Sequence, residues 1–210
     1  MHTPISIVAH TARLVTTTVD RITGDRVEVP LLVAAACQKA LSLFCIESRI
    51  MYGQAAWIEI LENNEPLWAG CWGENYSFWV ATQYGEVIDL NASIAHRKRS
   101  HTEPGLKSIC SPPILWSQEA PKFYRYKPEG VAELDLQDTK DQAYFRQVDD
   151  TLCASIPSID RDAPIDASHF PHESIICPDR RVLDDSRQSF AHFDRVLSVK
   201  GIPPVPQFLA

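Results

Sequence analysis

Residues 30–44 read PLLVAAACQKALSLF, an apolar run that is broken by only three polar side chains. Proline is well tolerated at the first position of a helix, because an N–H there would have no intrahelical acceptor. Pro30 is therefore expected to open a helix over residues 31–44. A helix that is apolar nearly all round is covered by other elements on most of its sides. We predict that this helix lies in the middle of the fold.

The apolar period differs before and after this run. Residues 5–22 carry apolar side chains at spacings of three and four and end before Gly24, which predicts an amphipathic helix. Residues 45–52 and 55–62 have the pattern of strands, and we predict a break between them near Gly53.

Residues 76–90 predict a β-hairpin with the loop Gln83-Tyr84-Gly85. If the loop has three residues and its glycine is left-handed, the strands pair so that Ser77 and Asp89 lie diagonally on one face. Such diagonal neighbours are about 7–8 Å apart at Cα. A two-residue turn would instead move Asp89 to the opposite face.

The remainder of the chain is less regular. We predict mostly loop over residues 91–121, a strand at 122–126, a helix at 140–154, a further helix at 184–198 and an extended tail at 203–206.

The predicted fold class is α+β, in a single domain with two parts. Residues 1–154 are expected to form the core, with the central helix packed on an antiparallel sheet. Residues 155–210 are expected to add a helical and extended segment that wraps this core, because their phenylalanine, isoleucine and valine content favours packing.

Composition excludes several classes of function. The 210 residues carry a formal charge of −7, so no broad basic surface is expected for nucleic acid. The short basic run at 96–99 is interpreted as a solvated loop. No apolar run reaches the roughly 18 residues of a membrane span. The six cysteines form no C-x-x-C pair and no signal segment is evident, so we expect a reducing, cytoplasmic location.

The order of these motifs resembles a known superfold. The apolar helix is followed by a strand ending in glycine, then WIEI (57–60), FWV (78–80) and GEVIDL (85–90). This order resembles the core of papain-like and transglutaminase-like cysteine enzymes, including arylamine N-acetyltransferases. The whole chain resembles a small bacterial family of uncharacterised proteins grouped with that superfold, with SPPILW (111–116) as a further feature.

The resemblance implies where a catalytic group would stand. In those enzymes a cysteine begins the buried helix, a histidine lies on a following strand and an aspartate on the next. The matching positions here are Pro30, Ser77 and Asp89, and only the aspartate is retained. The resemblance therefore implies a degenerate protein that binds a small molecule, a peptide or another protein in the vestigial cleft, without a cofactor. The expected ligand contacts are Glu28, Ser77, Trp79 and Asp89.

Each of these residues also has an ordinary structural interpretation. Pro30 serves as a helix starter, and Glu28 complements the positive end of the helix dipole. Ser77 is an ordinary strand residue lining a cleft. Asp89, followed closely by Asn91, has the pattern of a side chain that caps backbone amides where a strand ends.

Two alternatives to a degenerate protein stay open. In the first, the chain is an active cysteine hydrolase or acyltransferase that uses Cys71 or Cys37. Cys71 lies in AGCWG (69–73), where the glycines predict an exposed loop, whereas Cys37, in mid-helix, is expected to be a small buried hydrophobe. In the second, the chain is a structural or interaction protein, with a homodimer possible and residues 155–210 as its partner arm.

Two further groups of residues bear on a ligand site. The motif SHFPHE (168–173) places His169 and His172 close together, but the proline between them and the lack of a cysteine pair favour a loop over a metal site. His96 and His101 are interpreted in the same way. Several aromatic residues crowd the central third of the chain, and some of them are expected to wall a cleft: Trp57, Trp68, Trp72, Tyr76 and Trp79.

Overall fold

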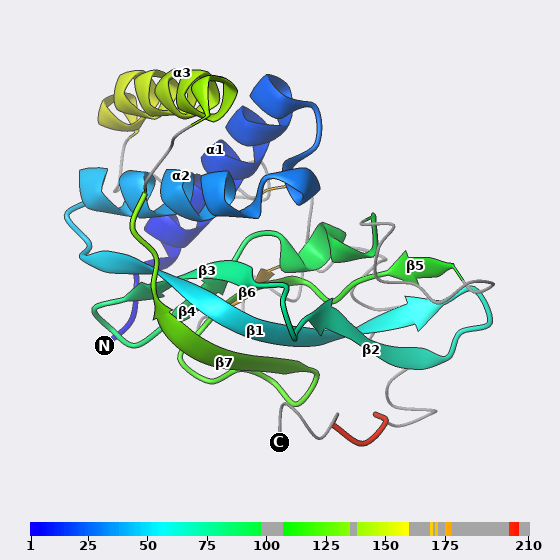
Figure 1. Cartoon of the computed structure of the whole chain (residues 1–210). Coiled ribbons are helices and arrows are strands. Elements are labelled where there is room, and N and C mark those ends of the chain that lie inside the picture. Colours follow the sequence, from blue (N-terminus) through cyan, green and yellow to red (C-terminus); the bar gives the residue numbers. More distant parts are fainter. Residues whose placement is uncertain are drawn as a thin grey trace.

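The computed structural model describes residues 1–97, 107–134, 138–159, 169, 171, 175–177 and 202–205. In this part of the chain, three α-helices lie together on one side of a curled, mostly antiparallel sheet (Figure 1), which confirms the α+β class. The helices are α1 (Ile5–Thr23), α2 (Pro30–Leu43) and α3 (Thr139–Ser155), with short 3-10 helices η1 (Arg26–Glu28), η2 (Ala92–Arg97) and η4 (Ile156–Ser158). The strands are β1 (Ser48–Leu61), β2 (Pro66–Cys71), β3 (Ser77–Thr82), β4 (Val87–Asp89), β5 (Ser108–Cys110), β6 (Ile114–Ser117), β7 (Tyr124–Val131) and β8 (Ile175–Ile176).

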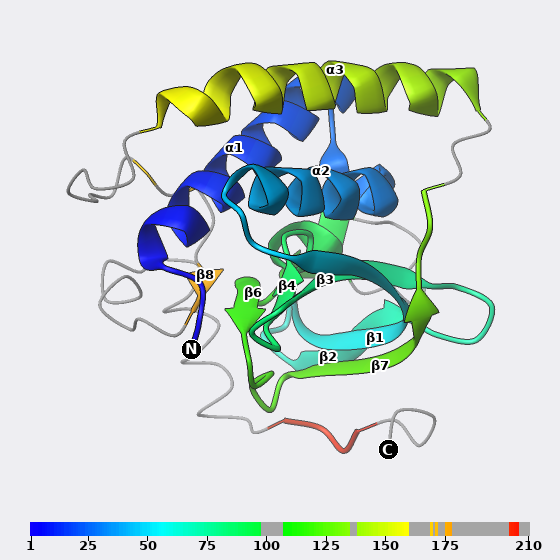
Figure 2. The same cartoon turned by 90° about the vertical axis from the view of Figure 1, so that its left-hand side faces the viewer.

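The helices form where the apolar periods predict them. Helix α1 ends at Gly24, whose φ of 89° is favoured by glycine. Helix α2 has Pro30 in its first turn, as predicted, and its central residues 33–37 are all buried. It packs against α1, α3 and β3. The prediction that α2 lies in the middle of the fold is therefore confirmed (Figure 2).

A single long strand, β1, organises the sheet. Strands β2 and β3 pair with successive parts of one edge of β1, and β5 and β7 pair along its other edge. The predicted break near Gly53 is wrong. A Cβ atom at Gly53 would lie 2.3 Å from the backbone oxygen of Lys127 in β7, so this glycine lets β7 approach closely while β1 continues past it.

The β3–β4 hairpin has the predicted loop. The N–H of Gly85 donates to the Thr82 carbonyl at 2.9 Å, and the N–H of Thr82 donates to the Glu86 carbonyl at 3.0 Å. Gly85 has a φ of 77°. Val80 pairs with Ile88, which is the predicted register.

The segment between β4 and β7 is more regular than predicted. Residues 91–121 contain η2, β5 and β6. These elements are short, and Pro112 and Pro113 separate β5 from β6, so their periodic signal in the sequence is weak. The strand predicted at 122–126 forms, but β7 continues to Val131. Pro128 is accommodated in β7 because it lies at a shift of register opposite β1.

Both faces of β1 are buried, so this strand separates two hydrophobic clusters. Ala55 and Trp57 point into a cluster within the curl of the sheet, whereas Ile58 and Ile60 point into a cluster on the other face. The largest cluster lies between the helices and strands β3, β4 and β6. Strands buried on both faces carry apolar residues almost continuously, which fits the sequence of β1.

Parts of the C-terminal segment contact the core. Strand β8 pairs in parallel with β6, and the Trp68 indole N–H donates to the Pro203 carbonyl at 3.0 Å. The helix predicted at 184–198 lies outside the described residues, and the division into 1–154 and 155–210 stays a prediction. Among the helices of the described residues, none combines the length and the apolar character that crossing a membrane requires.

Candidate functional site

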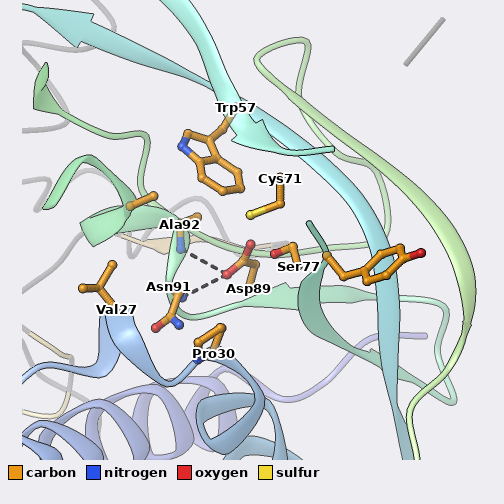
Figure 3. A pocket seen from close by; sticks show the side chains of 10 residues that line it. Val27, Pro30, Trp57, Cys71, Ser77, Asp89, Asn91 and Ala92 are labelled. Atoms are coloured by element: carbon orange, nitrogen blue, oxygen red, sulfur yellow. Dashed lines mark hydrogen bonds between the residues drawn. The ribbon is translucent and has the colours of Figure 1, made fainter. Parts of the chain in front are cut away.

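A small pocket lies where the start of α2 meets strands β2, β3 and β4 and the helix η2 (Figure 3). Pro30, Ser77 and Asp89 all line it. The pocket leaves about 30 Å³ for the centres of water molecules, where about 10–15 Å³ admits a single water. The structure thus brings the three positions implied by the resemblance to one site of modest size.

Local structure explains why these residues converge. Pro30 begins α2, Ser77 is the first residue of β3 and Asp89 is the last residue of β4. The three-residue hairpin loop sets the register that places Ser77 and Asp89 on the same face. A two-residue turn would have removed Asp89 from the pocket.

Asp89 is the best-anchored polar residue of the pocket, with only 3% of its surface exposed. Its Oδ1 accepts the backbone N–H of Asn91 at 2.9 Å and that of Ala92 at 3.1 Å, and its Oδ2 accepts the Tyr126 hydroxyl at 2.8 Å. Burial raises the pKa of Asp89, while these three hydrogen bonds act to lower it. The interpretation of Asp89 as a cap at the strand end is therefore correct.

Cys71 lies on the wall of the same pocket. The prediction of an exposed loop is wrong, because Cys71 is the last residue of β2 and is buried. The preceding Gly70 serves close packing: a Cβ atom there would lie 2.1 Å from the backbone oxygen of Ala55 in β1. In Figure 3 the Cys71 sulfur, the Ser77 hydroxyl and the carboxylate of Asp89 point toward one another.

Cys37 is in a different environment. It lies in the middle of α2 within the main hydrophobic core, with 1% of its surface exposed. Burial raises the pKa of its thiol far above the ordinary value. This placement agrees with the expectation of a small buried hydrophobe.

Two predicted ligand contacts do not line the pocket that holds Ser77 and Asp89. Glu28 is exposed on η1 and lines a neighbouring pocket beside α2. Trp79 is buried and lies 5.1 Å, between ring centroids, from Tyr126. Position 79 lies on the same face of β3 as Ser77. Its ring packs with Trp57 and Cys71 in the cluster within the curl of the sheet, and it lines an adjoining pocket together with Pro30 and Asp89.

Sequence reasoning missed two residues of the site. Asn91 lines the pocket and donates its Nδ2 to the Arg26 carbonyl at 3.3 Å. Tyr126, on β7, holds Asp89 from the far side. The turn Asp89-Leu90-Asn91 was a usable signal for Asn91, whereas nothing in the sequence connects Tyr126 with β4. Of the aromatic residues expected to wall a cleft, Trp57 and Tyr76 do so.

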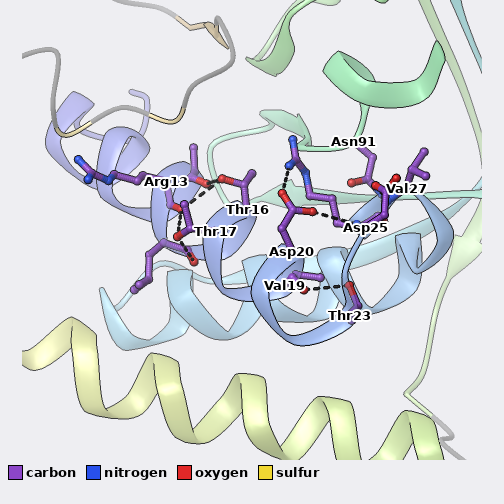
Figure 4. Close-up of polar contacts among 12 residues, drawn as sticks. Arg13, Thr16, Thr17, Val19, Asp20, Thr23, Asp25, Val27 and Asn91 are labelled. Carbon is purple, nitrogen blue, oxygen red and sulfur yellow. Dashed lines mark hydrogen bonds and ion pairs between the residues drawn. The ribbon is translucent and has the colours of Figure 1, made fainter. Parts of the chain in front are cut away.

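A partly buried ion pair at the end of α1 holds the segment beside the pocket (Figure 4). The Arg26 guanidinium pairs with Asp20 at the end of α1, and the Arg26 backbone N–H donates to the same carboxylate at 2.9 Å. These contacts hold η1 in place, and the backbone carbonyl of Arg26 in η1 accepts a hydrogen bond from the Asn91 side chain. Helix α1 therefore supports the pocket without lining it.

The histidines show no metal site in the described part of the chain. No group of three or more histidine, cysteine, aspartate or glutamate residues gathers there as a metal centre would require. The ring of His169 contacts that of His10 edge-on, with centroids 5.2 Å apart, and His96 Nδ1 lies 2.9 Å from Ser111 Oγ. His101 and His172 lie outside the described residues.

Comparison with known proteins adds little to this geometry. No protein-family model and no curated protein matches the chain. A crystal structure of a genomics target is similar at a TM-score of 0.46 and 12% sequence identity, covering 83% of this chain and 95% of that one. The fold defines the class of the protein as α+β, with a curled, mostly antiparallel sheet.

Proposed function

We propose that this protein is a catalytically degenerate relative of papain-like and transglutaminase-like cysteine enzymes, and that it binds a ligand in the pocket without thiol chemistry. The ligand is a small molecule or the end of a peptide or protein chain. The observation that carries the proposal is the convergence of Pro30, Ser77 and Asp89 on one pocket. In an active enzyme of that superfold, cysteine and histidine would occupy the first two positions.

The chemistry of the three residues supports binding over catalysis. A cysteine at a helix N-terminus is activated because the helix dipole lowers its pKa. Pro30 has no thiol and no backbone N–H, so position 30 offers neither a nucleophile nor a donor for a developing oxyanion. A serine at position 77 cannot replace an imidazole as a general base.

A second candidate function rests on Cys71. Its thiol lines the same pocket as Asp89 and Ser77, which favours it over Cys37 as the nucleophile of an active hydrolase or acyltransferase. Cys71 ends a strand, however, and no helix begins at it. It therefore lacks the dipole that commonly activates a catalytic thiol. The interaction-protein alternative stays a prediction, since most of residues 155–210 lie outside the described part of the chain.

The two functions are separated by a thiol-directed probe combined with a panel of amide, ester and thioester substrates. The variants are Cys71→Ala and, as a matched control, Cys153→Ala, which removes an exposed thiol on α3. We expect no turnover that depends on either cysteine. Turnover that is abolished by Cys71→Ala and kept by Cys153→Ala would replace the proposal with an active cysteine enzyme.

A further inference from the structure

The pocket holds two donors, the Ser77 hydroxyl and the Cys71 thiol, and two acceptors that have room for a further donor. Asp89 Oδ2 accepts one hydrogen bond, from Tyr126, and a carboxylate oxygen has room for a second. Asn91 Oδ1 is buried and has no hydrogen-bond partner among the described residues. An acceptor that is buried without a donor destabilises the protein by its desolvation free energy. The pocket therefore calls for a ligand that brings N–H or O–H groups.

The electrostatic balance of the pocket is negative. Asp89 is its acidic residue, and none of the described residues that line it is basic. The guanidinium of Arg26 lies nearby but is paired with Asp20. The start of α2 contributes about half a positive charge, which offsets the carboxylate only in part, and Pro30 supplies no N–H for an anion.

The walls and the size of the pocket further restrict the class of ligand that fits it. The Trp57 ring forms one wall (Figure 3), and the face of an indole attracts cations. The space of about 30 Å³ for water centres suits a head group of one or two heavy atoms. Tyr76 lines the pocket and is 44% exposed, so a chain attached to the head group has a way out to solvent beside this ring.

We infer that the pocket takes a small cationic head group with N–H donors, of the primary alkylammonium class, and excludes carboxylates. The ammonium group donates to Asp89 Oδ2, and the attached alkyl chain runs past Tyr76. This inference rests on the proposed function, since it names the class of ligand that the same pocket binds.

The test is an NMR titration of the ¹⁵N-labelled protein with ethylammonium chloride and, separately, with sodium acetate at equal ionic strength. We expect ethylammonium to shift the amides of Asn91 and Ala92 and the indole N–H of Trp57. The dissociation constant should be millimolar, as for other ligands with so few heavy atoms. Acetate should leave these signals unchanged. Equal shifts with acetate, or no shift with either salt, would overturn the inference.

A pair of variants locates the binding. Asp89→Asn removes the charge but keeps an oxygen for the two backbone amides, and it should weaken ethylammonium binding at least about tenfold. Asp138→Asn is the matched control, because Asp138, the exposed residue that precedes α3, also accepts backbone amides at the start of a helix. It should bind as the wild type does. If Asp89→Asn fails to fold, the contrast between ethylammonium and acetate on the wild type still decides the outcome.

The inference and the proposed function fail in different ways. Turnover that depends on Cys71 would end the proposed function and leave ethylammonium binding intact. A protein without such turnover that ignores ethylammonium would keep the proposed function and end the inference.

Discussion

Two of the buried carboxylates lie in strands of the sheet, and each is held by donors from its surroundings. Asp89 accepts three hydrogen bonds, and Glu59, near the end of β1, accepts the Trp57 indole N–H at 2.9 Å. Burial raises the pKa of both groups, and their hydrogen bonds oppose that rise. Trp57 is a wall of the pocket, so Glu59 orients a ring that lines it.

The raised pKa of Glu59 predicts a pH dependence of stability. In the folded protein the pKa of Glu59 lies above the unfolded value of about 4.3. The contribution of Glu59 to the free energy of unfolding is therefore fully present below that value, and it is lost as the pH rises through the folded pKa. As the pH rises through this range, the free energy of unfolding of Glu59→Gln should increase relative to that of the wild type, by at most about 1.4 kcal/mol per pH unit. Urea unfolding of both proteins from pH 4 to pH 8 would measure it.

Glu62→Gln is the control for this experiment, because Glu62 is exposed just beyond the end of β1. Its stability should run parallel to that of the wild type across the same range. A Glu59→Gln profile that is also parallel to the wild type would contradict the assigned direction of the shift.

Among the elements, the β3–β4 hairpin and β1 use glycine for different reasons. Gly85 has a φ of 77° and open space around its α-carbon, whereas a Cβ atom at Gly53 would meet the backbone of β7. The first glycine is needed for its conformation and the second for its lack of a side chain.

Substitutions at these two glycines should therefore differ. Gly85→Ala should cost about 1–2 kcal/mol through the left-handed conformation, and Gly85→Asn should cost less, because asparagine tolerates that region. Gly53→Ala should cost more than either, since the backbone of β7 must move. Unfolding in urea ranks the three variants, and a Gly53→Ala protein as stable as Gly85→Asn would contradict the account of β1.

The contact between the start of α2 and the hairpin allows a direct test of the proposed kinship. In the double variant Pro30→Cys, Ser77→His, the introduced thiol should have a pKa below the ordinary value of about 8.5, from the helix dipole and from the imidazole. Pro30→Cys alone should show a smaller depression. Alkylation rates against pH, followed at the level of the labelled peptide, would measure both values.

The control in this case is the triple variant that adds Asp89→Asn, which removes the carboxylate expected to orient the imidazole. It should shift the thiol pKa back toward that of the single variant. An identical pKa in the single and double variants would mean that positions 30 and 77 do not face each other as the kinship requires.

For the molecule as a whole, the described part of the C-terminal segment covers one face of the sheet. Ile202 and Val205 pack against the cluster that contains Ile58 and Trp68. Trp72, Cys110 and Phe123 also pack against this cluster, so residues 202–205 complete a cover that the sheet and its loops begin.

Removing those contacts should destabilise the protein without touching the pocket. The double variant Ile202→Ala, Val205→Ala should lose roughly 1–3 kcal/mol, the range for partly buried aliphatic side chains. Pro204→Ala, which changes an exposed neighbour, should stay within about 0.5 kcal/mol of the wild type. Equal stability of all three proteins would show that residues 202–205 do not protect this face.

Local patterns were enough to predict a good part of this protein. The apolar periods predicted α1, α2 and α3, and Gly85 in a three-residue loop predicted the register that places Ser77 and Asp89 on one face. These features depend on residues close together in the chain, so the backbone preferences and spacings that determine them can be found in the sequence itself.

The tertiary structure alone decided the rest. The continuity of β1 past Gly53, the burial of Cys71 and the contact of Tyr126 with Asp89 all arise where β1 pairs with strands that are distant in sequence. Such pairings depend on the packing of both faces of a strand at once. A pattern along one strand does not state which partner will cover it.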